Sequence, residues 1–157
     1  MKSTLILLLT LASLNALAES PAVYEKSVDQ NLDTAYKRVN KALEGNGFKV
    51  VYEIDMFENL TKFAAKNAVK DFNLNQLEGI KSMVFCNDPL AVKISNADPT
   101  MLAMCPLHLT LTQKAGRVSV LFVRPSVIAQ GSKAEAPAKV LEEKVIKAIE
   151  SGLNAAQ

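Results

Sequence analysis

The sequence contains none of the short motifs that carry catalysis in the large enzyme families. It has no GxSxG segment, no P-loop and no glycine-rich dinucleotide turn. A CxxCH segment for covalent haem attachment and the paired CxxC or HxxxH spacings of zinc sites are also missing. These absences exclude the enzymes that depend on such motifs, and we expect a protein without enzymatic activity.

An excess of charge of one sign is missing as well. The chain has 18 basic and 16 acidic residues, a formal net charge of +2. No polybasic segment stands out, so the charge pattern predicts neither nucleic acid nor an anionic membrane as a partner.

Long apolar runs are missing except at the N-terminus, where Lys2 precedes "LILLLTLASL" and an "ALA" pattern ends just before Glu19. This arrangement is typical of a secretory signal peptide over residues 1–18. The run is too short for a comfortable membrane span of roughly 20 residues. We therefore expect cleavage after Ala18 and a soluble periplasmic product without an integral membrane segment. Residues 19–157 are enough for a single domain with one core.

Hydrophobic periodicity predicts a mixed chain. Alternating patterns indicate strands at residues 22–28, 48–54 and 79–86, and 3.6-residue patterns indicate helices at 31–47, 57–69, 89–97 and 135–153. Two alternating runs within 107–123, joined near Gly116, predict a hairpin. This order, with a hairpin inside it, predicts an α+β fold. The helix after Pro89 has Asp88 available as its cap, and residues 124–132 are predicted as a loop.

The two faces of this hairpin are predicted to differ. The face assigned to the core holds Leu107, Leu109, Leu111, Val118, Val120 and Phe122. The second face holds His108, Thr110, Thr112, Ser119, Leu121 and Val123, joined by Val51 and either Phe85 or Met83 from neighbouring strands. Because this second face is partly apolar, we expect a ligand or a partner subunit to cover it, and a symmetric homodimer is the simplest arrangement.

The segment "MLAMCPLHL" places Met101, Met104, Cys105 and the single histidine, His108, within nine positions where a strand is expected to begin. One interpretation is structural: the methionines fill gaps in the core and the imidazole belongs to the sheet or to an interface. In the other, His108 is a ligand. One histidine from each subunit of a dimer would bind haem b, or Met101 or Met104 would supply the second axial ligand. Alternatively, the four residues together would bind copper as Cu(I), which prefers soft sulfur donors.

Two further pairs of residues have both a structural and a chemical interpretation. Cys86 and Cys105 form a disulfide, remain two buried thiols, or act as a redox couple. A bond between them would contribute on the order of 3 kcal/mol in the chain-entropy model. Asp55 and Glu58 form either a carboxylate pair or a helix cap. Three functions remain open: a haem- or metal-binding protein, a cofactor-free dimeric interaction or chaperone-like module, and a cysteine-based redox protein.

Several segments resemble the DUF302 family, a small domain of unknown function. They are "GFKVVYEID", "KDFNLNQLEGIKSMVFCNDPLAVKI" and "DPTMLAMCPLHLTLTQKAGRVSVLFVRP", followed by the final helix. The resemblance covers residues 22–152 and implies a β-α-β(4)-α fold of the TATA-box-binding-protein-like type, with helices on one face of an antiparallel sheet and a dimeric assembly. This chain adds short helices to that framework. It also inserts Asp88 into the family's Cys-Asn-Pro turn and places Cys105 before Pro106, where many members have a cysteine after the proline.

Overall fold

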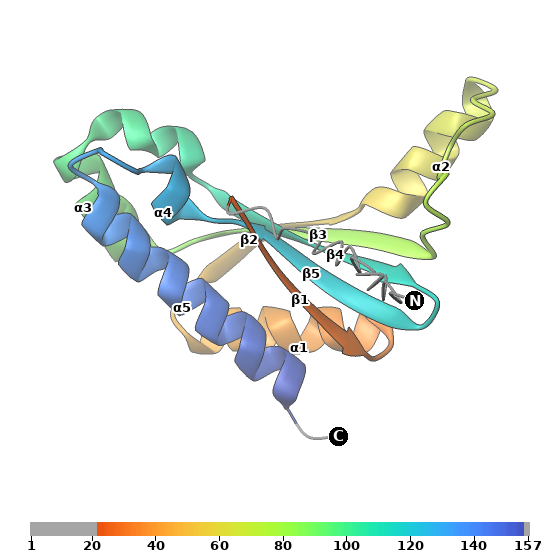
Figure 1. Cartoon of the computed structure of the whole chain (residues 1–157), viewed down its shortest axis with the longest axis horizontal. Coiled ribbons are helices and arrows are strands. Elements are labelled where there is room, and N and C mark those ends of the chain that lie inside the picture. The colour runs from red at the N-terminus through yellow and green to blue at the C-terminus, as the bar shows by residue number, and fades with distance from the viewer. Residues whose placement is uncertain (1–21, 156–157) are drawn as a thin grey trace, which may run out of the picture.

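Five antiparallel strands form one open sheet in the order β1-β5-β4-β3-β2 (Figure 1). The computed structural model describes residues 22–155, so the predicted signal peptide lies outside the described residues. The strands are β1 (Val23–Asp29), β2 (Lys49–Asp55), β3 (Gly79–Cys86), β4 (Leu107–Lys114) and β5 (Arg117–Val123). The helices are α1 (Leu32–Gly45), α2 (Met56–Lys66), α3 (Asp88–Ala97), η1 (Pro99–Met104), α4 (Pro125–Ile128) and α5 (Glu135–Asn154). The predicted α+β class and its β-α-β(4)-α framework with added short helices are confirmed.

The core lies between one face of the sheet and the helices α1 and α5, which cover that face (Figure 1). The hairpin is in the predicted register, with Leu109 opposite Phe122 and Leu111 opposite Val120, and all four side chains are buried. The core face predicted from alternation is therefore confirmed.

The helices α1 and α5 approach each other closely at Gly152. A Cβ atom on this residue would lie 2.8 Å from the Cα atom of Val39 in α1.

The hairpin turn consists of Ala115 and Gly116, with φ angles of 49° and 74°. Two successive positive φ angles match the right-handed twist of the flanking strands, which is why two-residue hairpins favour this geometry. Gly116 adopts it without a steric cost. The predicted position of the turn is confirmed.

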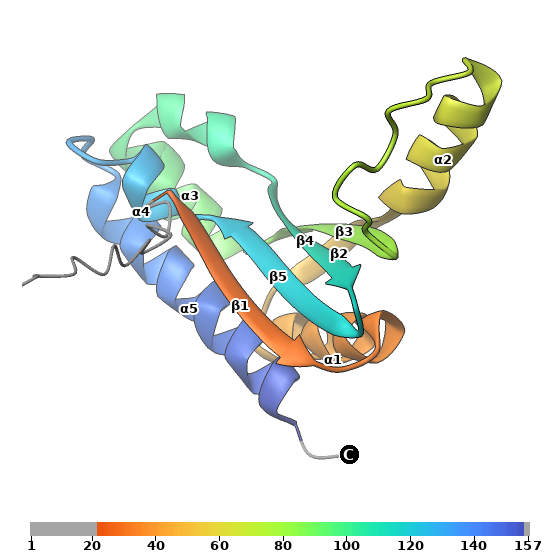
Figure 2. The ribbon, with the colours of Figure 1, turned by 45° about the vertical axis from the view of Figure 1, so that its right-hand side comes forward.

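The opposite face of the sheet is not covered by α1 or α5, and we call it the open face (Figures 1 and 2). The alternation of the paired strands assigns to it Val23, Glu25, Ser27, Tyr52, Ile54, Ile80, Ser82, Val84, His108, Thr110, Thr112, Ser119, Leu121 and Val123. The hairpin residues predicted for this face are confirmed.

The neighbours predicted from β3 are wrong, and β2 contains a bulge at Val51, the residue predicted from that strand. Val50 pairs with Phe85, but Tyr52 pairs with Val84, so Val51 is an extra residue that has no partner in the register. The bulge shifts the alternation by one residue and brings Tyr52 to the open face. Met83 and Phe85 are fully buried on the core face. The side chains that flank His108 in the register are therefore Val84 and, beyond it, Tyr52.

Other corrections concern short elements. The segment expected to begin a strand at residue 101 forms the 3-10 helix η1, and β4 begins only at Leu107. Asn87, and not Asp88, caps α3, because its side chain accepts a hydrogen bond from the backbone N–H of Leu90. Within the predicted loop at 124–132, residues 125–128 form α4, which begins with proline, a residue favoured at the first helical position.

The helix α2 leaves the end of β2 and projects away from the sheet on the side opposite α1 and α5 (Figure 2). It ends at residue 66, earlier than the predicted 69. In the part of the chain that the structure describes, no helix combines the length and apolar character needed to cross a membrane.

Candidate functional site

A cavity of about 260 Å³ opens at the end of the open face where β4 begins and β5 ends. We call it the His108 cavity. Its walls come from η1, the segment that leads into β4, the two strands and α4. The lining residues are Ala103, Met104, Pro106, Leu107, His108, Phe122, Val123, Pro125 and Ile128. His108 is the one polar or titratable side chain among them. Apolar walls with a single polar group to orient a ligand are typical of small-molecule sites.

The imidazole of His108 is exposed and makes no hydrogen bond to any residue between 22 and 155. Alternation along β4 turns it to the open face, while Leu107 and Leu109 on either side are buried in the core. Both ring nitrogens are therefore available to a ligand. A histidine that binds a metal in a protein usually has its second nitrogen held by a carboxylate or a carbonyl, and no residue between 22 and 155 holds the His108 ring in this way.

The remaining predicted ligands fall into two groups. Met104 lines the His108 cavity, so its thioether and the imidazole belong to one site. Met101 packs against the hydrophobic core and does not line the cavity. Cys105 lines a different cavity, so the predicted copper set of His108, Met104 and Cys105 does not share one cavity. Among residues 22–155, no three His, Cys, Asp or Glu side chains gather closely enough to hold a metal ion.

Cys86 and Cys105 are both free thiols, and both border a cavity too small to admit a water molecule. Burial raises the pKa of the Cys86 thiol, and the carboxylate of Asp88 raises it further. Burial also raises the pKa of the Cys105 thiol. Both thiols are therefore protonated at neutral pH, whereas reactive cysteines have a lowered pKa. The disulfide between them stays a prediction.

The wall formed by α4 is held in place by a buried carboxylate on α5. The Nε of Arg124 and the backbone N–H of Ser126 donate to the two Glu142 oxygens at 2.9 and 3.0 Å, and the Ser126 hydroxyl also donates to Glu142. The Glu142 side chain is 5% exposed. Burial raises the pKa of this carboxyl, but the hydrogen bonds from Ser126 and Arg124 outweigh burial and hold its pKa below the ordinary value. We call this group the Glu142 clamp.

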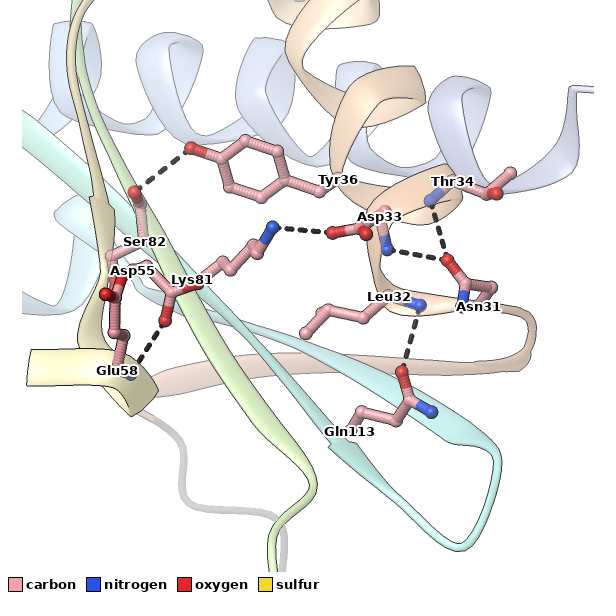
Figure 3. Close-up of polar contacts among 10 residues, drawn as sticks. All are labelled: Asn31, Leu32, Asp33, Thr34, Tyr36, Asp55, Glu58, Lys81, Ser82 and Gln113. Atoms are coloured by element: carbon pink, nitrogen blue, oxygen red, sulfur yellow. Dashed lines mark hydrogen bonds and ion pairs between the residues drawn. The ribbon is translucent and has the colours of Figure 1, made fainter. Parts of the chain in front are cut away.

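A second cavity, of about 290 Å³, is polar and lies where α1 begins, beside β3 and the hairpin. Its polar groups bind one another (Figure 3). Asn31 caps α1, Gln113 accepts a hydrogen bond from the backbone N–H of Leu32, and Lys81 pairs with Asp33. The hydrogen bond with Asp33 raises the pKa of Lys81. These contacts join α1 to the sheet, which is a structural role.

Asp55 lines this second cavity, and it does not form a carboxylate pair with Glu58. Asp55 caps α2 by accepting a hydrogen bond from the backbone N–H of Glu58 at 2.8 Å (Figure 3). The Glu58 carboxylate pairs with Lys62 one turn along the helix. The interpretation as a helix cap is confirmed.

Part of the His108 cavity was not predicted from the sequence. Pro125 and Ile128 come from a segment expected to be a loop, and the proline at the start of α4 is the signal that would have indicated a helix there. Tyr52 does not line the cavity, and its place on the open face was not predicted because a bulge cannot be recognised in an alternating pattern.

Comparison with known proteins relates the chain to a family without an assigned role. The family model described as "Domain of unknown function DUF302" matches residues 24–152. The crystal structure of an uncharacterized conserved DUF302 protein from Bacillus stearothermophilus is similar, with a TM-score of 0.73 and 16% sequence identity over 84% of this chain and 98% of that chain. At this identity the likeness concerns the fold alone. No curated protein matches the sequence.

Proposed function

The chain belongs to the DUF302 family, as the sequence resemblance predicted, and we propose that it is an exported, non-enzymatic protein that binds a small, largely apolar ligand through His108. The observation that carries the proposal is an imidazole that has no hydrogen-bond partner among residues 22–155 and lies in the wall of an otherwise apolar cavity. Burial of the apolar part of a ligand would supply affinity, and the imidazole would supply orientation.

Binding fits this site better than catalysis does. A catalytic histidine usually acts beside a nucleophile, a second acid–base group or a group that orients its ring. The lining of the His108 cavity contains no carboxylate, hydroxyl, thiol or lysine beside the imidazole. The residues that line the cavity can hold a molecule, but they offer no second group to act with the imidazole.

Haem b is the first candidate ligand. An imidazole nitrogen is a common axial ligand of haem iron, and apolar walls suit the porphyrin. Met104 would place a thioether in the same cavity, as a second ligand or as a packing contact. The cavity, at about 260 Å³, is slightly smaller than the roughly 300–1,000 Å³ of ordinary ligand pockets. One chain would therefore cover only part of a haem, and a second subunit on the open face would cover the rest.

Copper is a weaker candidate, because the protonated thiol of Cys105 lines another cavity and leaves only His108 and Met104 together. The same protonation weighs against a cysteine-based redox protein. A dimeric interaction or chaperone-like module is the second candidate function. The apolar side chains exposed on α2 favour it, since Leu60 and Phe63 are 40% and 60% exposed.

A haem titration tests the proposal, and His108→Ala is the variant on which it depends. We expect wild-type protein to give a saturable Soret shift. His108→Ala should fold normally, because the side chain lies outside the core, and should lose the shift. Added free imidazole should restore the shift in this variant by replacing the missing ligand. Thr112→Ala is the matched control, because Thr112 also lies on the open face of β4 but does not line the cavity.

A wild-type protein without a saturable shift would exclude haem, and a Cu(I) competition assay on the same variants would then test copper. A shift that persists in His108→Ala would contradict the role given to the imidazole. Replacing Met104 and Met101 by leucine in separate variants tests the thioether. We expect Met104→Leu to alter the haem spectrum, whereas Met101→Leu should not, because Met101 lies outside the cavity lining.

A further inference from the structure

The helix α2 and the segment that returns from it, residues 67–78, form an arm with an unpartnered apolar side. The helix is amphipathic, yet Ala64 is its one buried residue. The exposed fractions along the arm are 40% for Leu60, 60% for Phe63, 43% for Val69 and 77% for Leu74. A short helix in water gains little stability from its own hydrogen bonds, so an uncovered apolar side indicates a surface that packs against another molecule.

This apolar side continues onto the open face at the base of the arm. The Met56 thioether, at the first residue of α2, accepts a hydrogen bond from the Ser82 hydroxyl of β3 at 3.1 Å. Tyr52 and Val123 on the open face are 62% and 41% exposed, and Ile128 in the wall of the His108 cavity is 50% exposed. The arm, the open face and the wall of the cavity thus all carry exposed hydrophobic side chains.

The arm and the His108 cavity lie at opposite ends of the open face. Figures 1 and 2 show α2 beyond one end of the sheet and η1 and α4 beyond the other. A two-fold axis that lies along the open face, midway between the two ends and perpendicular to the line from arm to cavity, would bring the arm of each copy over the cavity of the other. Such an interface uses the same patch on both subunits, which is the requirement for a closed dimer.

We propose that a second copy of this chain docks on the open face and that its arm closes the His108 cavity with Leu60 and Phe63. This deepens the proposed function, on which it rests, because the partner's arm would complete the ligand site. The seven exposed side chains named above, at roughly 100 Å² each, give about 1,400 Å² for the two copies together. That value lies within the roughly 1,200–2,000 Å² of stable protein interfaces.

The mass of the ligand-free protein in solution is the first test. We expect wild type to be a dimer in light scattering at tens of micromolar, and Phe63→Ser to weaken dimerisation by about 30-fold or more, because a central aromatic anchor is lost. Val140→Ser is the matched control. Val140 is 46% exposed on α5, away from the open face, so its substitution should leave the dimer intact. Circular dichroism verifies that each variant is folded. A monomeric wild type, or equal masses for wild type and Phe63→Ser, would overturn the proposal.

Cross-linking tests the pairing itself. Two single variants, Phe63→Cys and Ile128→Cys, are mixed and treated with a short bis-maleimide. The two positions lie on α2 and α4, which are beyond opposite ends of the sheet, so a short link between them joins two copies (Figure 1). We expect a covalent dimer in the mixture and not in either variant alone. Replacing Ile128→Cys by Val92→Cys, on α3, should abolish the product, although Val92 is 58% exposed. Efficient linking within Phe63→Cys alone would mean that the arms pair with each other, and would contradict the arrangement.

The mass and cross-linking measurements are made without ligand, so the two proposals fail separately. A dimer that cross-links as expected but does not bind haem keeps the subunit arrangement and removes haem as the ligand. A monomer that binds haem through His108 keeps the ligand and overturns the arm. A monomer that instead binds unfolded polypeptide overturns the proposal that the arm contacts a second copy, and it favours the chaperone-like module.

Discussion

Replacing Glu142 by glutamine tests whether the Glu142 clamp stabilises the fold. The substitution keeps the size of the side chain but removes the charge that Arg124 and Ser126 surround. Its amide N–H₂ would face at least one of these donors. Breaking a buried ion pair costs about 3–5 kcal/mol. Because the Arg124 side chain is 38% exposed, water recovers part of that energy, and we expect a loss of about 2–3 kcal/mol in the free energy of unfolding.

Urea unfolding at pH 7 measures this loss, and a thermal melt should show a midpoint lower by about 6–12 °C. Glu143→Gln is the matched control. Glu143 is the next residue on α5, its side chain is exposed, and it has no ion pair or hydrogen bond within residues 22–155. Its substitution should change stability by less than about 0.5 kcal/mol. Equal stabilities of the two variants would refute the view that the clamp holds α4 against α5.

The lowered pKa of Glu142 predicts how this difference in stability depends on pH. The folded-state pKa of Glu142 lies below its ordinary value, so the unfolded chain binds the proton more readily. The stabilisation is fully present above the ordinary glutamate pKa near 4.3 and is lost as the pH falls through the lowered folded value. The difference between wild type and Glu142→Gln should therefore be largest at neutral pH and should shrink towards about pH 3. A difference that grows in acid would contradict the direction of the shift.

Two further predictions concern packing and the thiols. Gly152→Ala should destabilise the protein by about 1–3 kcal/mol in urea unfolding, because the new methyl group would meet the Val39 backbone of α1. Gly45→Ala is the control and should not destabilise it, because no atom lies within 4 Å of its Cβ position. Equal effects of the two substitutions would refute the close approach of the helices. Cys86 and Cys105 should react with a disulfide reagent at pH 7.5 at least about tenfold more slowly in the native protein than in guanidinium, because burial raises the pKa of both thiols. Native thiols that react as fast as the unfolded ones would restore the redox interpretation.

The sequence predicted the elements and the core face well where periodicity alone decides the structure. The hairpin, its turn at Gly116 and the helix ending near residue 153 all follow from short-range patterns. The bulge at Val51 could not be found in this way, since an inserted residue changes the face of those after it without changing their composition. Its consequence is that Tyr52 lies on the open face, where it pairs with Val84 beyond His108.

The candidate site was predicted in part. The alternation of β4 alone was sufficient to predict that His108 points to the open face. The separation of Cys105 from His108 could not be predicted from the sequence, because it depends on η1 replacing the expected start of a strand. The outward direction of α2 could not be predicted either. An amphipathic pattern predicts that a helix has an apolar side, but it does not say which surface that side packs against.

The pairing of β1 with β5 makes completion of the sheet a long-range step in folding. β1 is an edge strand whose partner in the sheet is β5, and Val23 lies opposite Val123, one hundred residues later. Strands so distant in sequence cost more chain entropy to bring together than local ones. The β4–β5 hairpin is local and has only a two-residue turn to close. β1 can therefore join the sheet only once β5 is in place, although it is the first of the strands in the sequence.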